Sequence, residues 1–330
     1  MKRHYKILLG CLVFLMGGIV CATSVGATEA PSFPVTIRHD LGTTTIAQEP
    51  KRIVTIGWSS EDAVLALGKV PVAMPRYSFF ESGIFPWNEP YLDGYQPVLL
   101  AGKTVDFERV AMLRPDLILA TSSDISEQTW RRLSSIAPTV AYRHGAFRTD
   151  WREQAELVGA ALGKLSEAKA LVEKTDAYLN EAGATFPQLK GKTFTFGTFF
   201  PGESNVVVYL PSDPRVAALM NMGLKASPGV ERLAEANPGI TSTSVSLERI
   251  GRLDADILLM WYGTGARQAA EAQPLFASLP AVQRGSYVAM DDPVEIWSTS
   301  ALSVSSIPYG FPKFLPRLAE AARKADDARQ

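Results

Sequence analysis

An internal repeat at an offset of 140 residues constrains the fold more than any other feature of this sequence. Residues 105–119 (VDFERVAMLRPDLIL) reappear as residues 245–259 (VSLERIGRLDADILL). Each copy has the pattern of a short helix, with Asp106 or Ser246 as its N-cap and a glutamate in its first turn, followed by a buried strand. One duplication is too little for a solenoid, so it predicts two similar α/β lobes. A chance resemblance between two amphipathic units is the alternative.

Strand-like and helical patterns alternate along the first half of the chain, which favours parallel α/β units. Apolar runs at 52–56, 116–120 and 139–142 alternate with helical patterns at 61–67 and 127–136. After Trp151 the helical pattern is strongest, and a helix over 167–183 would be roughly 25 Å long. We therefore predict an α/β fold with an N-terminal lobe at 28–150, a connecting helical region at 151–190 and a C-terminal lobe at 191–330. A single long helix would join the lobes, with the ligand cleft between them.

Residues 1–27 have the three parts of a secretory signal peptide. Lys2, Arg3 and Lys6 precede an apolar run at 7–21, and small residues at 22–27 follow it. A membrane anchor is the alternative, but this run is shorter than the ~20 residues that span a bilayer. We expect cleavage after Ala27 and an exported, periplasmic protein. Lipid attachment at Cys21, which would anchor the protein at the outer face of the membrane, is a second alternative, weakened by Val20 before the cysteine.

The composition excludes several kinds of function. Lys+Arg 33 against Asp+Glu 34 gives a formal net charge of -1, so nothing favours a nucleic-acid partner. Cys11 and Cys21 both precede the predicted cleavage point, and His39 and His144 are the histidines that follow it. The sequence has no H-E-x-x-H or G-x-S-x-G motif and no complete phosphate-binding loop. We therefore expect no catalytic residues, no protein-bound metal and no resident cofactor.

Aromatic and cationic residues gather in segments that we predict to be loops after strands. Aromatic rings offer apolar area with little entropy to lose, and Arg and Lys donate to anionic oxygens. Loops after parallel strands face the ligand site in α/β proteins, so these residues indicate a large, partly apolar, oxygen-rich ligand. The expected ligand-binding residues are Trp58, Arg76, Tyr77, Trp87, Lys103, Arg143, Arg148, Trp261, Tyr262 and Trp297, the last of them in a late loop.

Several of these segments resemble the ferric-siderophore-binding proteins of bacterial ABC importers. The resemblance is carried by residues 51–68 (KRIVTIGWSSEDAVLALG), 113–119 (LRPDLIL), the helix from Trp151, 245–250 (VSLERI) and 274–285 (PLFASLPAVQRG), and it spans about Thr36 to Ala322. Membership of that family implies two α/β lobes joined by one long helix, little hinge bending and a shallow ligand cleft.

The resemblance also implies a function and partners. The chain would be a monomeric, non-enzymatic protein that captures a ferric siderophore, whose own oxygens hold the iron, and delivers it to an inner-membrane ABC permease. Glu108 and Glu248 would meet arginines of the permease; stabilisation of a helix N-terminus is the alternative role of these two glutamates. Haem or cobalamin is the alternative cargo, and an exported enzyme on a two-lobed scaffold is the alternative class. Lys103 stands nearest the position where hydroxamate-binding members tend to have arginine, so the siderophore type stays open.

Overall fold

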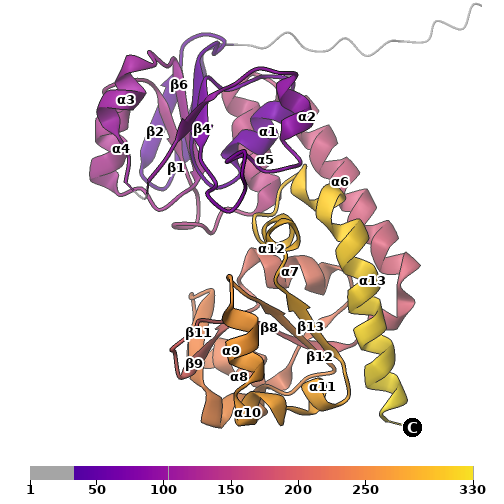
Figure 1. Ribbon diagram of the computed structural model, residues 1–330. Helices are drawn as coiled ribbons and strands as arrows, with labels where there is room; N and C mark the ends of the chain where they lie inside the picture. Colours follow the sequence, from indigo (N-terminus) through magenta and orange to yellow (C-terminus); the bar gives the residue numbers. More distant parts are fainter. Residues whose placement is uncertain (1–32, 103, 330) are drawn as a thin grey trace, which may run out of the picture. The chain divides into compact units, whose positions relative to one another are not determined.

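Two large β-sheets, one in each half of the chain, organise the fold (Figure 1). The computed structural model describes residues 33–102 and 104–329, all of which belong to one compact unit. The expected signal peptide at 1–27 lies outside the described residues. None of the described helices combines the length and apolar character needed to cross a membrane.

The first lobe contains a parallel sheet whose strand order places β3 at its centre. The strands in spatial order are β5 (Val98–Leu100), β4 (Ala73–Pro75), β3 (Ile53–Gly57), β6 (Leu117–Ser122) and β7 (Thr139–Ala141). An antiparallel hairpin, β1 (Val35–His39) with β2 (Gly42–Ile46), precedes it. The helices of this lobe are α1 (Ser60–Ala66), α2 (Glu89–Leu92), α3 (Phe107–Met112) and α4 (Glu127–Ser134). Strand and helix therefore alternate as the apolar pattern predicts.

The second lobe contains a mixed sheet. Its order is β11 (Ser242–Ser246), β9 (Asn205–Tyr209), β8 (Thr193–Phe199), β12 (Ile257–Trp261) and β13 (Tyr287–Met290), and β10 (Lys225–Ala226) also pairs with β8. Strands β8, β12 and β13 are parallel, whereas β9 is antiparallel to β8 and to β11. The helices are α7 (Pro214–Asn221), α8 (Pro228–Ala236), α9 (Ala266–Glu271), α10 (Pro274–Ala277), α11 (Pro280–Gln283) and α12 (Pro293–Ser300).

The repeat occupies equivalent places in the two lobes. Its first copy forms α3 and β6, and β6 lies parallel to β3; its second copy forms the 3₁₀ helix η2 (Leu247–Leu253) and β12, which lies parallel to β8. Asp106 caps α3 by accepting a hydrogen bond from the Arg109 backbone N–H. Ser246 lies at the N-cap position of η2, as expected, but its side chain makes no capping hydrogen bond, and the residue also ends strand β11. The helix–strand unit that the repeat predicts is present in both lobes.

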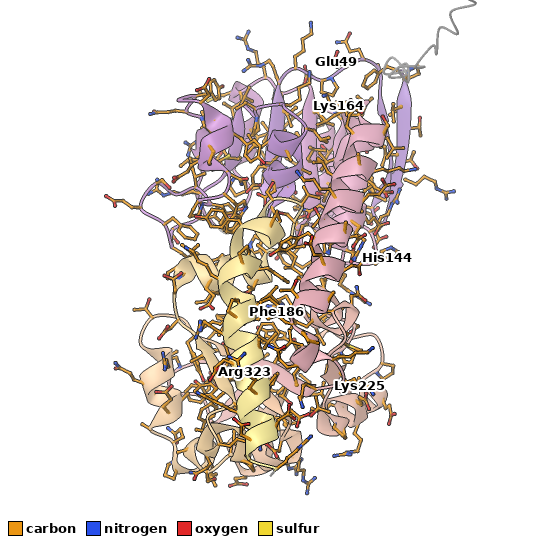
Figure 2. The ribbon with its side chains drawn as sticks, turned by 90° about the vertical axis from the view of Figure 1, so that its right-hand side faces the viewer. Glu49, His144, Lys164, Phe186, Lys225 and Arg323 are labelled. Carbon is orange, nitrogen blue, oxygen red and sulfur yellow. The ribbon has the colours of Figure 1, made fainter. Side chains whose placement is uncertain are left out.

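Two long helices run along both lobes. After α5 (Trp151–Ala161), which Gly163 ends with a φ of 68°, α6 (Leu165–Thr185) leads to the short 3₁₀ helix η1 (Pro187–Leu189). Helix α13 (Ser306–Asp327) contains Pro312 and Pro316, and the sequence patterns do not predict it. Both prolines are exposed, so the backbone hydrogen bonds that they cannot donate are missing on the solvent side of the helix. The opposite, apolar face of the helix is continuous and buried. Helices α6 and α13 lie side by side (Figures 1 and 2).

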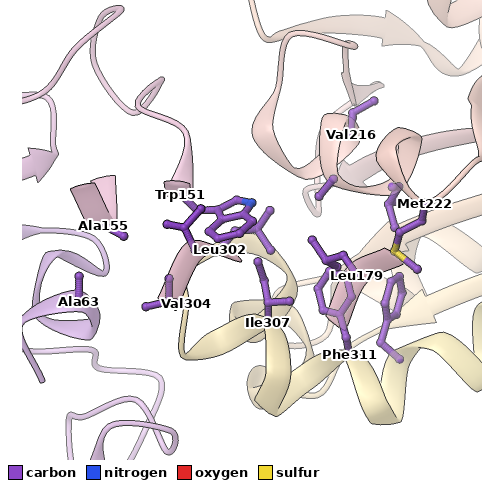
Figure 3. Close-up of a cluster of buried hydrophobic side chains, with 14 of the residues drawn as sticks. Ala63, Trp151, Ala155, Leu179, Val216, Met222, Leu302, Val304, Ile307 and Phe311 are labelled. Carbon is purple, nitrogen blue, oxygen red and sulfur yellow. The ribbon is translucent and has the colours of Figure 1, made fainter. Parts of the chain in front are cut away.

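The C-terminal part of the chain packs into the first lobe. Residues 301–307 are all buried, and the largest apolar cluster contains side chains from both lobes. Figure 3 shows Leu302 and Val304, which precede α13, beside Trp151, Ala155 and Ala63 of α5 and α1. Apolar contacts far apart in sequence therefore hold the end of the chain against the first lobe.

Candidate functional site

Four aromatic side chains form a partly exposed surface, which we call the aromatic cluster: Trp58, Phe79, Phe147 and Trp297. The Trp58 ring centroid lies 4.9 Å from that of Phe147 and 5.2 Å from that of Trp297, and Phe79 lies 4.8 Å from Trp297. Trp58, Phe79 and Phe147 are 40%, 58% and 38% exposed. A soluble protein rarely leaves contiguous large rings in water, so such a surface indicates a binding site.

The order of elements explains why these rings meet. Trp58 directly follows β3, Phe79 lies in the loop after β4, and Phe147 lies in the loop after β7. Since β3, β4 and β7 belong to one parallel sheet, their carboxyl ends lie at one edge, where α/β proteins bind ligands. Trp297 comes from the other lobe. The expectation that Trp297 lies in a loop is wrong, because the residue is part of α12.

The backbone before Trp58 is fixed by a glycine. Gly57 has a φ of +90°, and a Cβ at this position would lie 2.2 Å from the Ser122 carbonyl oxygen. This close approach lets the Trp58 N–H donate to that oxygen at 2.7 Å, while Gln154 Nε2 donates to the Trp58 carbonyl at 3.1 Å. The chain is thus held where the indole can project outward.

Beneath the aromatic cluster lies a buried stack of rings, the aromatic floor: Tyr77, Phe85 and Trp87. The centroids of Tyr77 and Phe85 are 3.6 Å apart, and those of Phe85 and Trp87 are 4.4 Å apart. Tyr77 and Trp87 are buried, although both belong to the expected ligand-binding set. Their position supports the exposed rings from below, since Phe85 lies 6.1 Å from Trp297.

Two neighbouring carboxyl groups are fully buried next to the aromatic floor. Tyr77 Oη donates to Glu61 Oε1 at 2.6 Å, while Glu61 Oε2 has no hydrogen-bond partner among the described residues. Asp62 accepts hydrogen bonds from Trp87 Nε1 at 2.8 Å, Asn88 Nδ2 at 2.6 Å and Ser303 Oγ at 2.5 Å.

The environment separates the two acids. Burial, with the neighbouring Asp62 charge, raises the pKa of Glu61 to about 8. Burial also raises the pKa of Asp62 to about 6, against the three donated hydrogen bonds that favour its ionised form. At neutral pH the pair therefore carries one negative charge, and the three donated hydrogen bonds favour its location on Asp62.

The expected cations differ in their surroundings. Arg76 and Arg148 are exposed and form no ion pair with a described residue. Arg143, by contrast, donates to Glu153 Oε1 at 3.0 Å and to the Arg38 carbonyl oxygen at 3.0 Å, so its charge is already compensated. Lys103 lies outside the described residues. Of the expected cations that the structure describes, Arg76 and Arg148 are thus the ones left to meet an anionic ligand.

In the second lobe a further aromatic group follows the strand ends. Trp261, at the end of β12, donates through Nε1 to Tyr209 Oη at 2.9 Å, and the exposed Phe200 lies 6.0 Å from its ring. The Arg215 guanidinium stacks 3.7 Å above the Tyr209 ring and pairs with Asp213. Phe200 and Trp261 thus lie at the carboxyl ends of β8 and β12, and the Arg215 guanidinium stacks on the tyrosine that bonds to Trp261.

Tyr262 is not part of either exposed surface. Its side chain is fully buried in the core of the second lobe, and Tyr287 Oη donates to its hydroxyl at 2.6 Å. The residue follows a parallel strand, as expected, but its side chain points into the core.

Four residues of these two surfaces are absent from the expected ligand-binding set. Phe79, Phe147, Phe200 and Arg215 all lie in or just after a segment that follows a strand, which is the signal that selected Trp58. That signal does not separate exposed from buried rings. Only the tertiary structure therefore identifies these four residues as part of the candidate site.

The two glutamates of the repeat lie on the surface, as a docking role requires. Glu108 is exposed on α3 and Glu248 is exposed on η2. Among the residues that the structure describes, no three His, Cys, Asp or Glu side chains come close enough together to hold a metal ion.

Residues 53–294 match the family described as periplasmic binding protein. The chain belongs to this family. The match confirms the family resemblance and the two-lobed α/β fold that the sequence predicts, and the family consists of substrate-binding proteins rather than enzymes.

Relatives of the chain match most of its length. It is 27% identical over 316 residues to the probable siderophore-binding lipoprotein YfiY of Bacillus subtilis (strain 168), covering 91% of this chain and 94% of that protein. It is 25% identical over 240 residues to the Fe(3+) dicitrate-binding periplasmic protein FecB of Escherichia coli (strain K12), covering 70% and 76%. Its structure is similar to that of Streptococcus pneumoniae TIGR4 PiaA in complex with ferrichrome, with a TM-score of 0.79, 25% identity and coverage of 88% and 99%.

Proposed function

We propose that this chain captures a ferric siderophore or a similar ferric chelate and delivers it to an ABC permease. The observation that carries the proposal is the aromatic cluster, which exposes rings from both lobes at the carboxyl ends of parallel strands. The names of the relatives support the choice of ligand class, since they include siderophore-binding and ferric-citrate-binding proteins.

The site suits a ligand that brings its own metal coordination. The siderophore's oxygens hold the iron, the rings of Trp58, Phe79 and Trp297 cover the apolar rim, and Arg76 and Arg148 complement anionic oxygens at the edge of the chelate. The chain then needs no resident metal, no cofactor and no catalytic residue.

Delivery requires an exported protein with a docking surface. We propose that the mature chain works as a monomer outside the inner membrane, either free in the periplasm or lipid-anchored. Glu108 and Glu248, one on each lobe, present exposed carboxylates to cationic side chains of the permease.

Intrinsic tryptophan fluorescence of the mature protein tests the ligand class, because Trp58 and Trp297 belong to the aromatic cluster. The protein is titrated with ferrichrome, ferric dicitrate and ferric enterobactin, with haem, cobalamin and iron-free ferrichrome in parallel. We expect saturable quenching by one of the ferric chelates at micromolar or lower concentration, and recovery of that chelate unchanged. Saturation by haem or cobalamin alone contradicts the iron-chelate assignment, and conversion of the ligand contradicts a purely binding role.

A further inference from the structure

One oxygen of Asp62 joins the aromatic floor to the C-terminal part of the chain. Asp62 Oδ2 accepts hydrogen bonds from Trp87 Nε1 and from Ser303 Oγ. Trp87 belongs to the floor, whereas Ser303 lies three residues after the end of α12, the helix that carries Trp297. Asp62 therefore contacts both sides of the candidate site, although it is itself fully buried.

The bond between Asp62 and Ser303 is part of a larger arrangement. Ser303 Oγ accepts hydrogen bonds from the Ser306 and Ser305 backbone N–H groups, at 2.9 and 3.2 Å, where the 22-residue helix α13 begins. These bonds polarise the hydroxyl, and the positive end of α13 favours the nearby carboxylate charge. A hydrogen bond to a buried charge is stronger and more directional than one between neutral groups.

Apolar packing alone does not fix the orientation of this segment. Leu302 and Val304, on either side of Ser303, are buried against α1 and α5 (Figure 3), and Ser59 Oγ donates to the Ala301 carbonyl at 3.3 Å. The apolar contacts hold the segment in the first lobe without direction, because hydrophobic burial is non-directional, and the Ser59 hydrogen bond joins two neutral groups at the long distance of 3.3 Å. The hydrogen bond from Ser303 to the Asp62 carboxylate is the stronger directional contact, and it orients the segment.

We propose that Asp62 is a positioning residue of the ligand site, which acts through Ser303 to hold Trp297 in place against the aromatic floor and Trp58. The inference rests on the proposed function, since it assigns the aromatic cluster to ligand binding. A ligand that contacts rings from both lobes binds most tightly when their spacing is set in advance. Without the Asp62–Ser303 hydrogen bond, the ligand must order Trp297 as it binds, and this entropic cost lowers the affinity.

The first test compares two serines in the same segment. Ser303→Ala removes the donor to Asp62, and Ser305→Ala is the matched control, because the buried Ser305 hydroxyl makes no hydrogen bond with a described residue. We expect Ser303→Ala to weaken binding of the preferred chelate of the panel by about tenfold, as for the loss of one hydrogen bond to a charged group. Ser305→Ala should bind within about twofold of the parent, and Ser303→Thr, which keeps the hydroxyl, should restore binding.

The second test asks whether the effect passes through Asp62. Asp62→Asn removes the charge at almost unchanged volume and should weaken binding at least as much as Ser303→Ala. Combining the two substitutions should weaken binding clearly less than the product of the two single effects, because both remove the Asp62–Ser303 hydrogen bond, while the bonds that Ser303 Oγ accepts from the Ser305 and Ser306 N–H groups are lost only with the serine. Additive effects would overturn the proposal. Should Ser303→Ala not fold, Ser303→Cys, a weak donor of similar size, takes its place.

A third readout needs no ligand. Near-ultraviolet circular dichroism reports fixed asymmetric packing of aromatic rings, so we expect the spectrum of the free protein to change in Ser303→Ala and Asp62→Asn but not in Ser305→Ala. If no chelate binds the parent protein, the proposed function fails, while the spectra still decide whether Asp62 positions the rings. Spectra and affinities that are alike for Ser303→Ala and Ser305→Ala overturn the positioning role.

Discussion

Replacing Glu61 by glutamine should make this protein more stable at alkaline pH than its parent. Glu61 is fully buried beside Asp62, and one of its oxygens, Oε2, has no hydrogen-bond partner among the described residues. A glutamine keeps the oxygen that accepts from Tyr77 and has nearly the same shape as a protonated glutamate. It therefore imitates the neutral form of Glu61 and removes the ionised form.

The size of the effect follows from the pKa of Glu61, which burial raises from 4.5 to about 8. Between pH 4.5 and about 8 the folded protein keeps the Glu61 proton that the unfolded chain releases. The folded state is therefore most stable at the acidic end of this interval, and its stability falls as the pH rises. The contribution of Glu61 to the free energy of unfolding falls by about 1.4 kcal/mol per pH unit in this interval, which amounts to about 3 kcal/mol at pH 7 and about 5 kcal/mol above pH 8.

Urea unfolding at pH 5, 6, 7 and 8 measures this loss. The parent and Glu61→Gln should agree within about 1 kcal/mol at pH 5, and at pH 8 the variant should be more stable by about 4 kcal/mol. Glu108→Gln, at an exposed position on α3, controls for the loss of one acidic group. Parallel stability curves for the parent and Glu61→Gln would refute the reasoning, because Glu61 would then ionise at the same pH in the folded and unfolded chain.

Three further predictions concern the aromatic cluster and the docking surface. Trp58→Ala should weaken chelate binding by about tenfold or more in the fluorescence titration. The urea midpoint of this variant should stay close to that of the parent, because the ring is partly exposed. Unchanged affinity would remove Trp58 from the site. Gly57→Ala should lower the free energy of unfolding by about 2 kcal/mol or more, since the new Cβ meets the Ser122 carbonyl; equal urea midpoints would contradict this clash. Reversing the charge of both Glu108 and Glu248 should abolish uptake of the chelate by whole cells and leave binding of the chelate to the purified protein unchanged. If binding were lost as well, the substitutions would have damaged the fold, and the experiment would not support a docking role.

The sequence predicts the framework of this protein well because the framework depends on local patterns. Apolar periodicity identifies β3, β6 and β7, and the repeat correctly predicts that β6 and β12 have equivalent roles in the two lobes. The same local reasoning misses α13, since Pro312 and Pro316 interrupt its pattern. These prolines are tolerated because both face solvent while the opposite face packs against the rest of the protein.

The candidate site is only partly accessible to such reasoning. A ring that follows a parallel strand is predicted to lie near the ligand edge, and Trp58 does so. The same rule selects Tyr77, Trp87 and Tyr262, which are buried. Exposure depends on what covers a ring, and the covering groups come from distant parts of the chain.

The sequence by itself therefore determined the family, the two α/β lobes and the strand ends at which aromatic and cationic residues gather. Periodicity and motif order are properties of neighbouring residues, so they can be read along the chain. Only the tertiary structure decided which rings stay exposed, that Trp297 joins Trp58, and that Asp62 bonds to Ser303, 241 residues away. The physical reason is that a buried charge needs donors at close range, and only the folded chain brings those donors to it.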